Sequence, residues 1–384
     1  MDKLRFFILR IIQCILIIYF ALIGYVKLKK PFWSRQPIFH FYNLYYWIKP
    51  NQIIEKDLIK IDKFYDDDIY FEEFEKISTE KKDMFIDFIK NNYLTDEKEK
   101  YTPTKKSITD IFTGHNGKSF ISLKIYNNKI LSSIISNPLY FKYNEKKLKV
   151  HYADFLCVDK IHRNKMYAGI QAYTHYYHGR QKTNNDIVLF KRENKSNFIV
   201  PFTVYNNYIF KIDNWKSCFT FDQPNITVVF VNKSNMNKFF SIYEKSKKKF
   251  KYFISFNLGN IFNMIFNNHM VITCLMVNEV FVSYYVFKNP YTTYYDVKSL
   301  EFCSSFKDDN IDDNLFVLGY MISQSLVSKD LDTKIVLIEN LANNDIIINK
   351  LMTKYTYFAK TINSLYLYNF ACYPKYSNEI MCII

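Results

Sequence analysis

The first apolar stretch of the chain is long enough to cross a membrane as a helix. It covers residues 6–26 and has three interruptions, Arg10, Gln13 and Gly24. About twenty such residues match the thickness of a bilayer core. Lysines follow the stretch and no small-x-small cleavage site does, which favours an uncleaved anchor over a signal peptide. We expect residues 1–30 to be a membrane anchor with a basic flank; an amphipathic or core helix is the alternative.

Basic residues flank the apolar stretch on both sides, with slightly more of them after it. Positively charged flanks tend to remain on the cytoplasmic side of a membrane. We therefore expect a membrane-anchored protein whose main body lies in the cytosol.

After the anchor, short apolar runs of strand length alternate with longer runs that have the period of an amphipathic helix. The runs with strand character are residues 118–126, 129–136, 155–158, 186–190, 227–230, 279–290, 334–338 and 365–372. The runs with helical character are residues 168–180, 235–249 and 314–328. Both kinds recur in similar order along the chain, which predicts an α/β fold with a mixed sheet flanked by helices. We expect two pseudo-duplicated halves, residues 31–222 and residues 223–384.

Composition favours a packed fold and gives no support to nucleic-acid binding. Hydrophobic residues make up 49% of the 384 residues and aromatic residues 19%, so global disorder is not expected. The formal net charge is +15, but basic residues are spread among acidic ones. No basic and aromatic motif of a nucleic-acid reader is present. The charge suits a phosphate-rich cofactor or an anionic membrane surface.

The cysteines and histidines do not form the spacings of a metal site or a disulfide framework. The cysteines are odd in number and widely spaced, at Cys14, Cys157, Cys218, Cys274, Cys303, Cys372 and Cys382. This pattern favours a reducing compartment. His175 and His178 share a helical face but have no third ligand nearby in sequence, so we expect no metal. Cys157 lies in an apolar strand, which favours a core position over a nucleophilic one.

Residues 152–169 combine an apolar strand, a cationic turn and a helix start made of small residues. The strand is Phe155–Val158, the turn carries Arg163 and Lys165, and the helix opens at Ala168. Free N–H groups at a helix start and the helix dipole attract phosphate groups. The stretch therefore indicates a phosphate-binding loop; a buried strand followed by a solvated basic turn is the alternative.

This stretch resembles the central signature of the N-myristoyltransferases, in which Phe-Leu-Cys-Val precedes a basic turn and an Ala. More broadly, it resembles the pyrophosphate loop of GNAT-type acyltransferases. Phe32–Ile38 resembles the family's Phe-Trp-x-x-Gln-Pro-Val segment, although a membrane-interface aromatic belt is the alternative. Residues 91–94, with Asp96, Glu97 and Glu99 after them, resemble Glu-Asn-Tyr-Val and its acidic loop; because lysines are interleaved with these acids, a solvated loop is the alternative. Residues 279–290 resemble Phe-Leu-Ser-Phe-Tyr-x-x-Pro, and residues 365–372 resemble Tyr-Tyr-Leu-Tyr-Asn-Trp-x-Cys.

One segment departs from the family. Where the family has Gly-Thr-Cys-Arg-Tyr-Trp-His at its peptide site, this chain has Pro201–Tyr208, and only Thr203 matches. The departure leaves the expected acyl-CoA site unchanged and puts peptide recognition in doubt.

The resemblance implies an enzyme that moves a myristoyl group from myristoyl-CoA to the N-terminal glycine of a protein. Backbone N–H groups of Phe155 and Leu156 would form an oxyanion hole, and the α-carboxylate of Ile384 would be the base. The residues implied to bind acyl-CoA are Phe32, Trp33, Leu156, Cys157, Val158, Arg163, Asn164, Lys165, Met166, Tyr167 and Ala168. The residues implied to bind the glycine peptide are Asp154, Thr203, Tyr284 and Tyr285. The first half would hold acyl-CoA and the second half the peptide.

Two other functions fit the same residues. One is a GNAT-type acyltransferase with a different acyl chain or amine acceptor. The other is a non-catalytic, membrane-tethered protein that binds acyl-CoA. A buried Ile384 that faces Thr203 and Asp154 would favour the enzyme. An Ile384 that is exposed and far from Phe155 would favour the binding protein.

Overall fold

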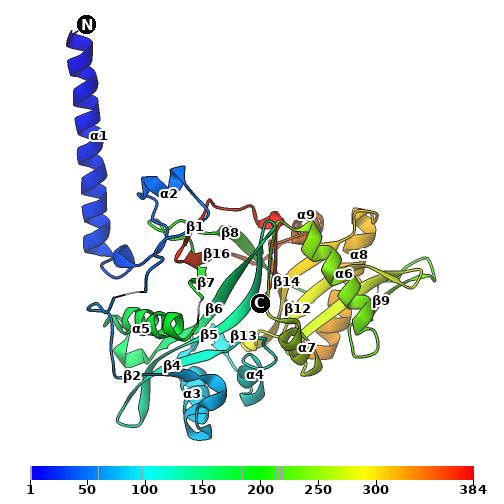
Figure 1. The fold of residues 1–384 in the computed structure, drawn as a ribbon. Helices are drawn as coiled ribbons and strands as arrows, with labels where there is room; N and C mark the ends of the chain where they lie inside the picture. The colour runs from blue at the N-terminus through cyan, green and yellow to red at the C-terminus, as the bar shows by residue number, and fades with distance from the viewer. Residues whose placement is uncertain (1, 59, 97, 184, 213–214, 216–218) are drawn as a thin grey trace.

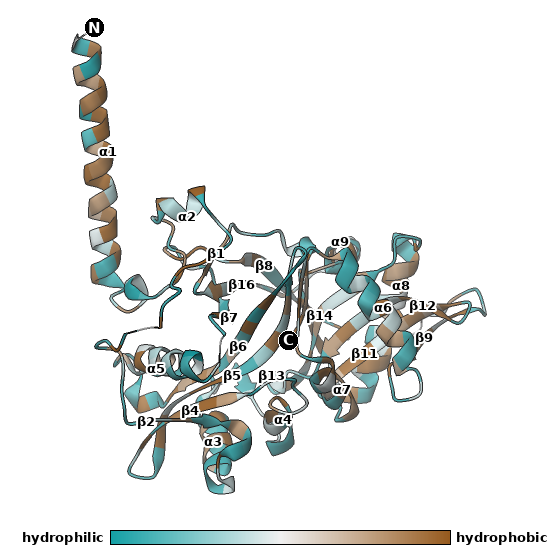
Figure 2. Cartoon of the chain, viewed as in Figure 1, coloured by the Kyte–Doolittle hydropathy of each residue, from teal (hydrophilic) through white to brown (hydrophobic). Residues whose placement is uncertain are grey.

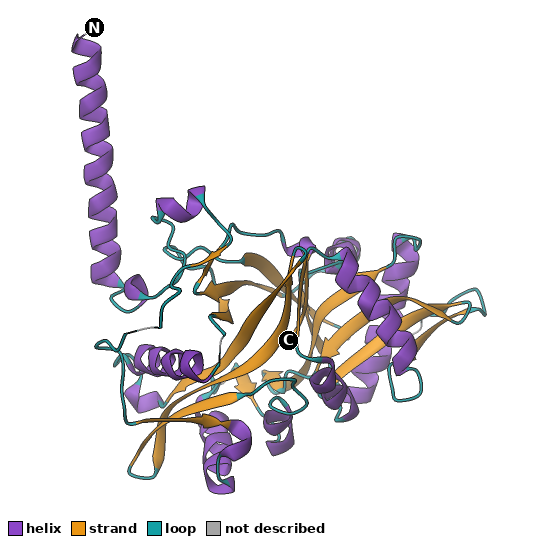
Figure 3. Cartoon of the chain, viewed as in Figure 1, coloured by secondary structure: helices purple, strands orange, loops and turns teal. Residues whose placement is uncertain are grey.

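The computed structural model describes residues 2–384 except 59, 97, 184, 213–214 and 216–218. The helices are α1 (Asp2–Lys29), α2 (Leu44–Ile48), α3 (Thr79–Asn92), α4 (Lys105–Asp110), α5 (Tyr167–Lys182), α6 (Met236–Lys249), α7 (Leu258–Phe266), α8 (Asp313–Leu331) and α9 (Asn344–Met352). In Figure 1, α1 extends away from a body in which the other helices pack around one large mixed sheet. Figure 3 shows the strands of that sheet as a continuous curved layer.

Most strands belong to this one sheet. Its strands along the main path are β18 (Ile380–Ile383), β10 (Tyr252–Ser255), β5 (Lys129–Tyr143), β6 (Lys146–Val158), β7 (Ile187–Glu193), β16 (Ala359–Tyr368), β8 (Thr203–Lys211), β15 (Ile335–Glu339), β14 (Val297–Lys307), β12 (Val280–Lys288), β11 (Met270–Val277) and β9 (Ile226–Phe230). The strands beside this path are β2 (Ile69–Glu73), β3 (Glu99–Tyr101), β4 (Phe120–Tyr126) and β13 (Thr292–Tyr294). A separate short pair joins β1 (Gln52–Ile53) to β17 (Phe370–Ala371). The predicted mixed α/β fold is confirmed.

Two parts of the sheet repeat the same pairing pattern. In the series β4, β5, β6, β7 and β16, successive strands pair antiparallel, antiparallel, parallel and antiparallel. The series β11, β12, β14, β15 and β8 has the same pattern. In each series a helix, α5 or α8, connects the two parallel strands. The expected pseudo-duplication is therefore visible in the topology.

The two series exchange their last strands. β16, which comes late in the chain, pairs with β7, whereas β8, which comes before β9, pairs with β15. β16 and β8 then pair with each other and join the two parts of the sheet. The largest core cluster contains buried side chains from both parts, among them Phe141, Phe202, Phe253 and Met381.

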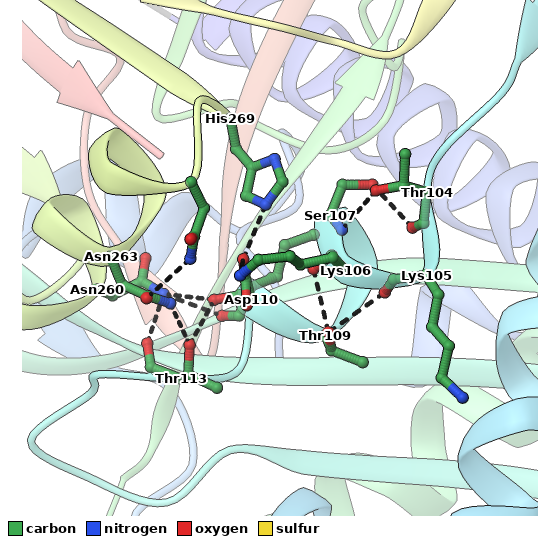
Figure 4. A network of polar contacts seen from close by, with 12 residues as sticks. Thr104, Lys105, Lys106, Ser107, Thr109, Asp110, Thr113, Asn260, Asn263 and His269 are labelled. Carbon is green, nitrogen blue, oxygen red and sulfur yellow. Dashed lines mark hydrogen bonds and ion pairs between the residues drawn. The ribbon is translucent and has the colours of Figure 1, made fainter.

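A polar junction between α4 and α7 holds the two parts together on one face (Figure 4). The side-chain amide of Asn260 donates to the backbone carbonyls of Asp110 and Thr113, at 3.0 and 2.7 Å. Close contact needs glycine on both sides, since a Cβ on Gly259 would lie 2.5 Å from the carbonyl oxygen of Gly114. Gly114 also has a φ of +76°, a conformation that favours glycine.

Among the described residues, α1 is the one helix long and apolar enough to cross a bilayer, by length and composition. Figure 2 shows apolar residues along most of its length. Its outer surface is exposed, for example at Phe7, Ile17 and Phe20, and near its end Val26 is buried against the body. The predicted helix over residues 6–26 is confirmed.

Candidate functional site

Strand β6 bulges at Phe155. Asp154 pairs with Ile135 and Cys157 with Ser133, so β6 carries one extra residue between these pairs. Phe155 has a φ of +47°, and the hydroxyl of Ser133 donates to its carbonyl at 3.1 Å. A bulge of this kind turns backbone groups away from the sheet ladder and is common beside active sites.

Two cavities meet at this bulge. The first has a volume of about 380 Å³ and lies where β6, β7 and α5 face the segment after α1. The second has a volume of about 620 Å³ and extends toward α4, β12 and β14. Five residues line both cavities: Tyr93, Asp154, Phe155, Lys191 and Arg192. A molecule in one cavity could therefore approach a molecule in the other at the bulge.

The first cavity has a mainly apolar wall. Phe32 and Trp33 pack edge to face with ring centres 5.1 Å apart, and Trp33 stacks on Phe190 at 5.8 Å. Phe32 lies against Gly169, where a Cβ would be only 2.9 Å from the Phe32 ring. Leu156, which is partly exposed, also lines this cavity. The structure thus brings Phe32, Trp33 and Leu156 together, as the sequence suggested.

The start of α5 carries no capping side chain. Its N-cap residue, Met166, has a left-handed conformation and makes no side-chain capping hydrogen bond. The equivalent helix of the second series, α8, is capped by Asp312, which accepts hydrogen bonds from the N–H groups of Asn314 and Leu315. A carboxylate at that place repels a phosphate. Of these two equivalent helix starts, the one at α5 therefore suits an anion.

The turn before α5 is exposed from Arg163 to Met166. The Arg163 guanidinium donates to the carbonyls of Asn92 and Val158, at 2.7 and 3.3 Å, so it also ties the turn to the end of α3. Four residues of the sequence-predicted group therefore lie in one exposed turn before the uncapped helix start: Arg163, Asn164, Lys165 and Met166. Tyr167 and Ala168 begin α5 itself and are partly buried.

Asp154 is partly buried where the two cavities meet. Its carboxylate accepts a hydrogen bond from the N–H of Phe155 at 2.7 Å. Burial raises the pKa of Asp154, and the Phe155 N–H and the lysines Lys288 and Lys191 offset this only in part. The Phe155 N–H, one of the two expected oxyanion donors, is thus already bonded to this carboxylate.

Lys191 supplies a positive charge between the two cavities. Its ammonium lies 2.5 Å from Glu339 and 3.5 Å from Glu301, and the Tyr205 hydroxyl donates to Glu339 at 2.9 Å. Burial opposes the charged form of Lys191, but the two carboxylates hold its pKa well above the ordinary value. Glu301, Glu339 and Cys303 lie close enough together to resemble a metal-ligand group, and here the lysine forms ion pairs with both carboxylates.

Ile384 lies at the end of β18, which pairs in parallel with β10. The Lys288 ammonium, from the wall of the second cavity, donates to a carboxyl oxygen of Ile384 at 3.0 Å. Ser304 holds the strand before it, because its hydroxyl donates to the Cys382 carbonyl at 2.7 Å. Ile384 is partly buried and does not itself line either cavity, but Lys288 connects its oxygen to the wall of the second one.

Several predicted residues lie away from the cavities. The hydroxyl of Thr203 donates to the carbonyl of Lys375. The hydroxyls of Tyr284 and Tyr285 are hydrogen-bonded to Ser246 and to the carbonyl of Phe316. All three side chains are fully buried in the packed interior. The side chain of Cys157 packs in the core beneath α3, where burial raises its pKa to about 11, and Val158 follows it at the end of β6.

In the second cavity, many of the wall residues that the sequence did not single out are charged or polar. Lys191, Glu301 and Lys288 are such residues, and so is His269, which lies 2.8 Å from Asp110 (Figure 4). Each is a charged or polar residue within or at the end of an apolar strand, which is the signal that could have identified it. Of the predicted acidic loop, Glu99 lines the second cavity and Glu97 lies outside the described residues.

Comparisons with known proteins identify the fold. No protein-family model matches the chain, and no curated protein matches it by sequence. The crystal structure of Saccharomyces cerevisiae N-myristoyltransferase with bound myristoyl-CoA is 13% identical, with a TM-score of 0.72 over 90% of this chain and 93% of that one. A second structure of the yeast enzyme with bound myristoyl-CoA is 11% identical, with a TM-score of 0.73 over 92% and 94%. The resemblance predicted from short segments is confirmed for the fold: this chain has the N-myristoyltransferase fold in a divergent sequence.

Proposed function

We propose that the protein transfers a long-chain acyl group, myristoyl in the first instance, from acyl-CoA to the N-terminal glycine of a protein. The observation that carries the proposal is the meeting of two cavities at the bulged backbone of Phe155, within this fold. An acyl donor and an amine acceptor need separate sites that meet at one reacting carbon.

The first cavity suits the donor. Its apolar wall, with Phe32, Trp33 and Leu156, fits an acyl chain or the cofactor's apolar parts. The uncapped start of α5, with Lys165 beside it, suits the phosphates of CoA, because free N–H groups and the helix dipole favour anions. Arg163, Asn164, Met166, Tyr167 and Ala168 would frame that site.

The second cavity suits the acceptor. Asp154 would hold the ammonium of the terminal glycine, and the Ile384 carboxylate would remove its proton. The amine nitrogen then attacks the thioester carbonyl carbon and the C–S bond breaks. The nitrogen gives up its second proton to the departing CoA thiolate, so the products are the amide and CoA as a thiol, and the carboxylate returns the first proton to solvent. The N–H of Leu156 would stabilise the oxyanion, joined by that of Phe155 once Asp154 turns to the ammonium.

A different amine acceptor remains the second candidate. Thr203, Tyr284 and Tyr285, which the resemblance assigns to the peptide, lie in the core and leave the second cavity to other residues. Charged side chains such as Glu99 and Lys288 shape it instead. Comparison of glycine-initiated peptides with other amines separates the two candidates.

The decisive experiment uses the full chain in detergent with myristoyl-CoA. Peptides that begin with glycine are compared with the same peptides beginning with alanine, and a second protein carries one extra residue after Ile384. We expect acylation of the glycine peptides alone, and its loss in the extended protein with unchanged myristoyl-CoA binding. Binding without transfer to any amine would contradict the proposal and leave an acyl-CoA-binding protein.

We also propose that α1 anchors the protein in a membrane, with the body on the cytosolic side. Its length, its exposed apolar surface and the lysines that follow it support this placement. The test is extraction of the protein from membranes. We expect detergent to release it, and high salt or alkaline carbonate not to.

A further inference from the structure

A second apolar surface lies beside α1. Residues 41–48, which include the short helix α2 and are called the foot below, present four large side chains to the outside. These are Leu44 (58% exposed), Tyr45 (55%), Trp47 (38%) and Ile48 (76%). Figure 1 shows α2 beside the lower third of α1, projecting from the body on the side to which α1 extends, and Figure 2 shows apolar residues on both.

A hydrogen bond fixes the level of the foot along α1. The hydroxyl of Tyr19 donates to the carbonyl of Tyr42 at 2.9 Å. Tyr19 precedes Val26, the last residue of the apolar stretch, by seven residues. A helix rises about 1.5 Å per residue, so this contact lies about 10 Å inside the apolar stretch. If the stretch spans the bilayer core, the foot reaches the level of the acyl chains.

Several backbone groups of the foot have hydrogen-bond partners within the protein, which suits them to an environment without water. The carbonyl of Phe41 accepts from the indole N–H of Trp47 at 2.8 Å, and the carbonyl of Trp47 accepts from the hydroxyl of Tyr373. The carbonyl of Tyr42 is bonded to Tyr19 as described, and the amide of Phe41 donates to Phe198. Lipid cannot bond to backbone groups, so a segment enters it only when the protein provides these partners.

We propose that the foot is a second membrane contact, which inserts Leu44, Tyr45, Trp47 and Ile48 into the bilayer beside α1. The proposal rests on the membrane insertion of α1 and goes beyond the proposed catalytic function. Interfacial segments of this kind insert their apolar faces about 5–10 Å into the headgroup and acyl boundary. Lys49, the residue that follows the foot, is exposed and suits the headgroup region.

The foot is also connected to the wall of the first cavity. The ring nitrogen Nε2 of His40, the residue before the foot, is bonded to the carbonyl of Trp33 at 2.9 Å. Trp33 lines that cavity. Insertion of the foot would therefore hold the apolar cavity close to the bilayer, the apolar environment that a fatty acyl chain favours.

The test places tryptophan reporters in the full chain, reconstituted into phosphatidylcholine vesicles whose acyl chains are brominated and quench nearby tryptophan. Ile48→Trp reports on the foot, Phe7→Trp on α1, and Phe240→Trp, exposed on α6, is the matched control. Wild-type emission is subtracted. We expect at least twofold stronger quenching for Ile48→Trp than for Phe240→Trp, close to that of Phe7→Trp.

Quenching of Phe7→Trp alone would overturn the membrane contact and leave the anchor standing. Absence of quenching at both positions would overturn the contact together with the anchor. If the foot instead meets a second copy of the chain, Ile48→Trp would escape the lipid quencher, and its emission would change with protein density in the vesicles. Trp47→Phe is a second check, because it should remove most of the lipid-quenched emission of the wild-type protein.

Discussion

The carboxylate of Asp154 is bonded to the N–H of Phe155, the next residue, at 2.7 Å, and both groups lie where the donor and acceptor cavities join. A group of the proposed acceptor site thus occupies a group of the proposed oxyanion hole. The arriving ammonium could draw the carboxylate away and free the N–H for the thioester. Binding of the amine would then complete the catalytic site.

We predict that Asp154→Asn stabilises the free protein at neutral pH. Burial raises the pKa of Asp154 in the folded state above that of the unfolded chain, so its ionisation costs stability as pH rises through the folded-state pKa. Below the unfolded pKa, about 3.9, both states are protonated and the cost disappears. The difference in Tm between variant and wild type should therefore be positive at pH 7–8 and shrink toward pH 4.

Thermal unfolding across this pH range checks the prediction. Asp87→Asn, at an exposed position on α3, is the control and should leave the pH profile unchanged. A variant Asp154→Asn that is less stable than wild type at pH 8 would show that the carboxylate is a net stabilising group.

Lys191→Met should destabilise the fold strongly, because it leaves the buried carboxylate of Glu339 without its cation. Loss of one partner of a buried ion pair costs about 3 kcal/mol or more. The double variant Lys191→Met with Glu339→Gln removes the charge that was left and should recover a large part of this loss. Denaturant unfolding of the wild type, the single variant and the double variant measures these free energies of unfolding. Equal stability of the single and double variants would contradict the pairing.

Gly169→Ala should weaken binding of acyl-CoA, because the new Cβ would press on the ring of Phe32 in the first cavity. A shift of that ring should reduce the binding free energy by about 1 kcal/mol, which corresponds to roughly a fivefold weaker affinity. Gly179→Ala in the same helix has no atom within 4 Å of its new Cβ. It should raise stability by about 0.5–1 kcal/mol and leave affinity unchanged. Titration with myristoyl-CoA, followed by Trp fluorescence, compares the two variants.

Asn260→Ala should loosen the junction between α4 and α7. Its side-chain amide donates hydrogen bonds to backbone carbonyls at the end of α4. Without these bonds the carbonyls have lost their partner, which should lower the free energy of unfolding by about 2 kcal/mol. Asn263→Ala removes a bond to the hydroxyl of Thr113 and one from the side chain of Asn267, and it leaves the backbone carbonyls bonded, so it should cost less (Figure 4). Chemical denaturation measures both, and an equal effect would show that the junction does not depend on Asn260.

The sequence was sufficient to predict the order of the elements and the mixed sheet. The predicted strand runs 118–126 and 129–136, for example, correspond to β4 and β5, and the two residues between them, Asn127 and Asn128, form a turn with positive φ. Phe32, Trp33 and Leu156 could be placed at one site because a distinctive local pattern surrounds each of them.

The acceptor cavity could not be predicted in the same way. Tyr284 and Tyr285 lie on neighbouring positions of one buried strand, and the sequence does not say which faces of that strand meet a cavity or the core. Lys191 meets Glu339 only because β16 and β8 bring β7 near β15. Such contacts depend on long-range pairing, which local patterns do not encode.

The exchange of strands has a consequence for how the protein is made. β7 and β8 are synthesised early, yet they cannot pair with each other, because β16, residues 359–368, lies between them. A nascent chain must therefore hold two unsatisfied strand edges until most of it has left the ribosome. Unpaired strand edges pair readily with strands of other chains, and pairing between strands far apart in sequence is slow. We expect this protein to depend on chaperones during synthesis and to lose its fold, rather than only its activity, when shortened before β16.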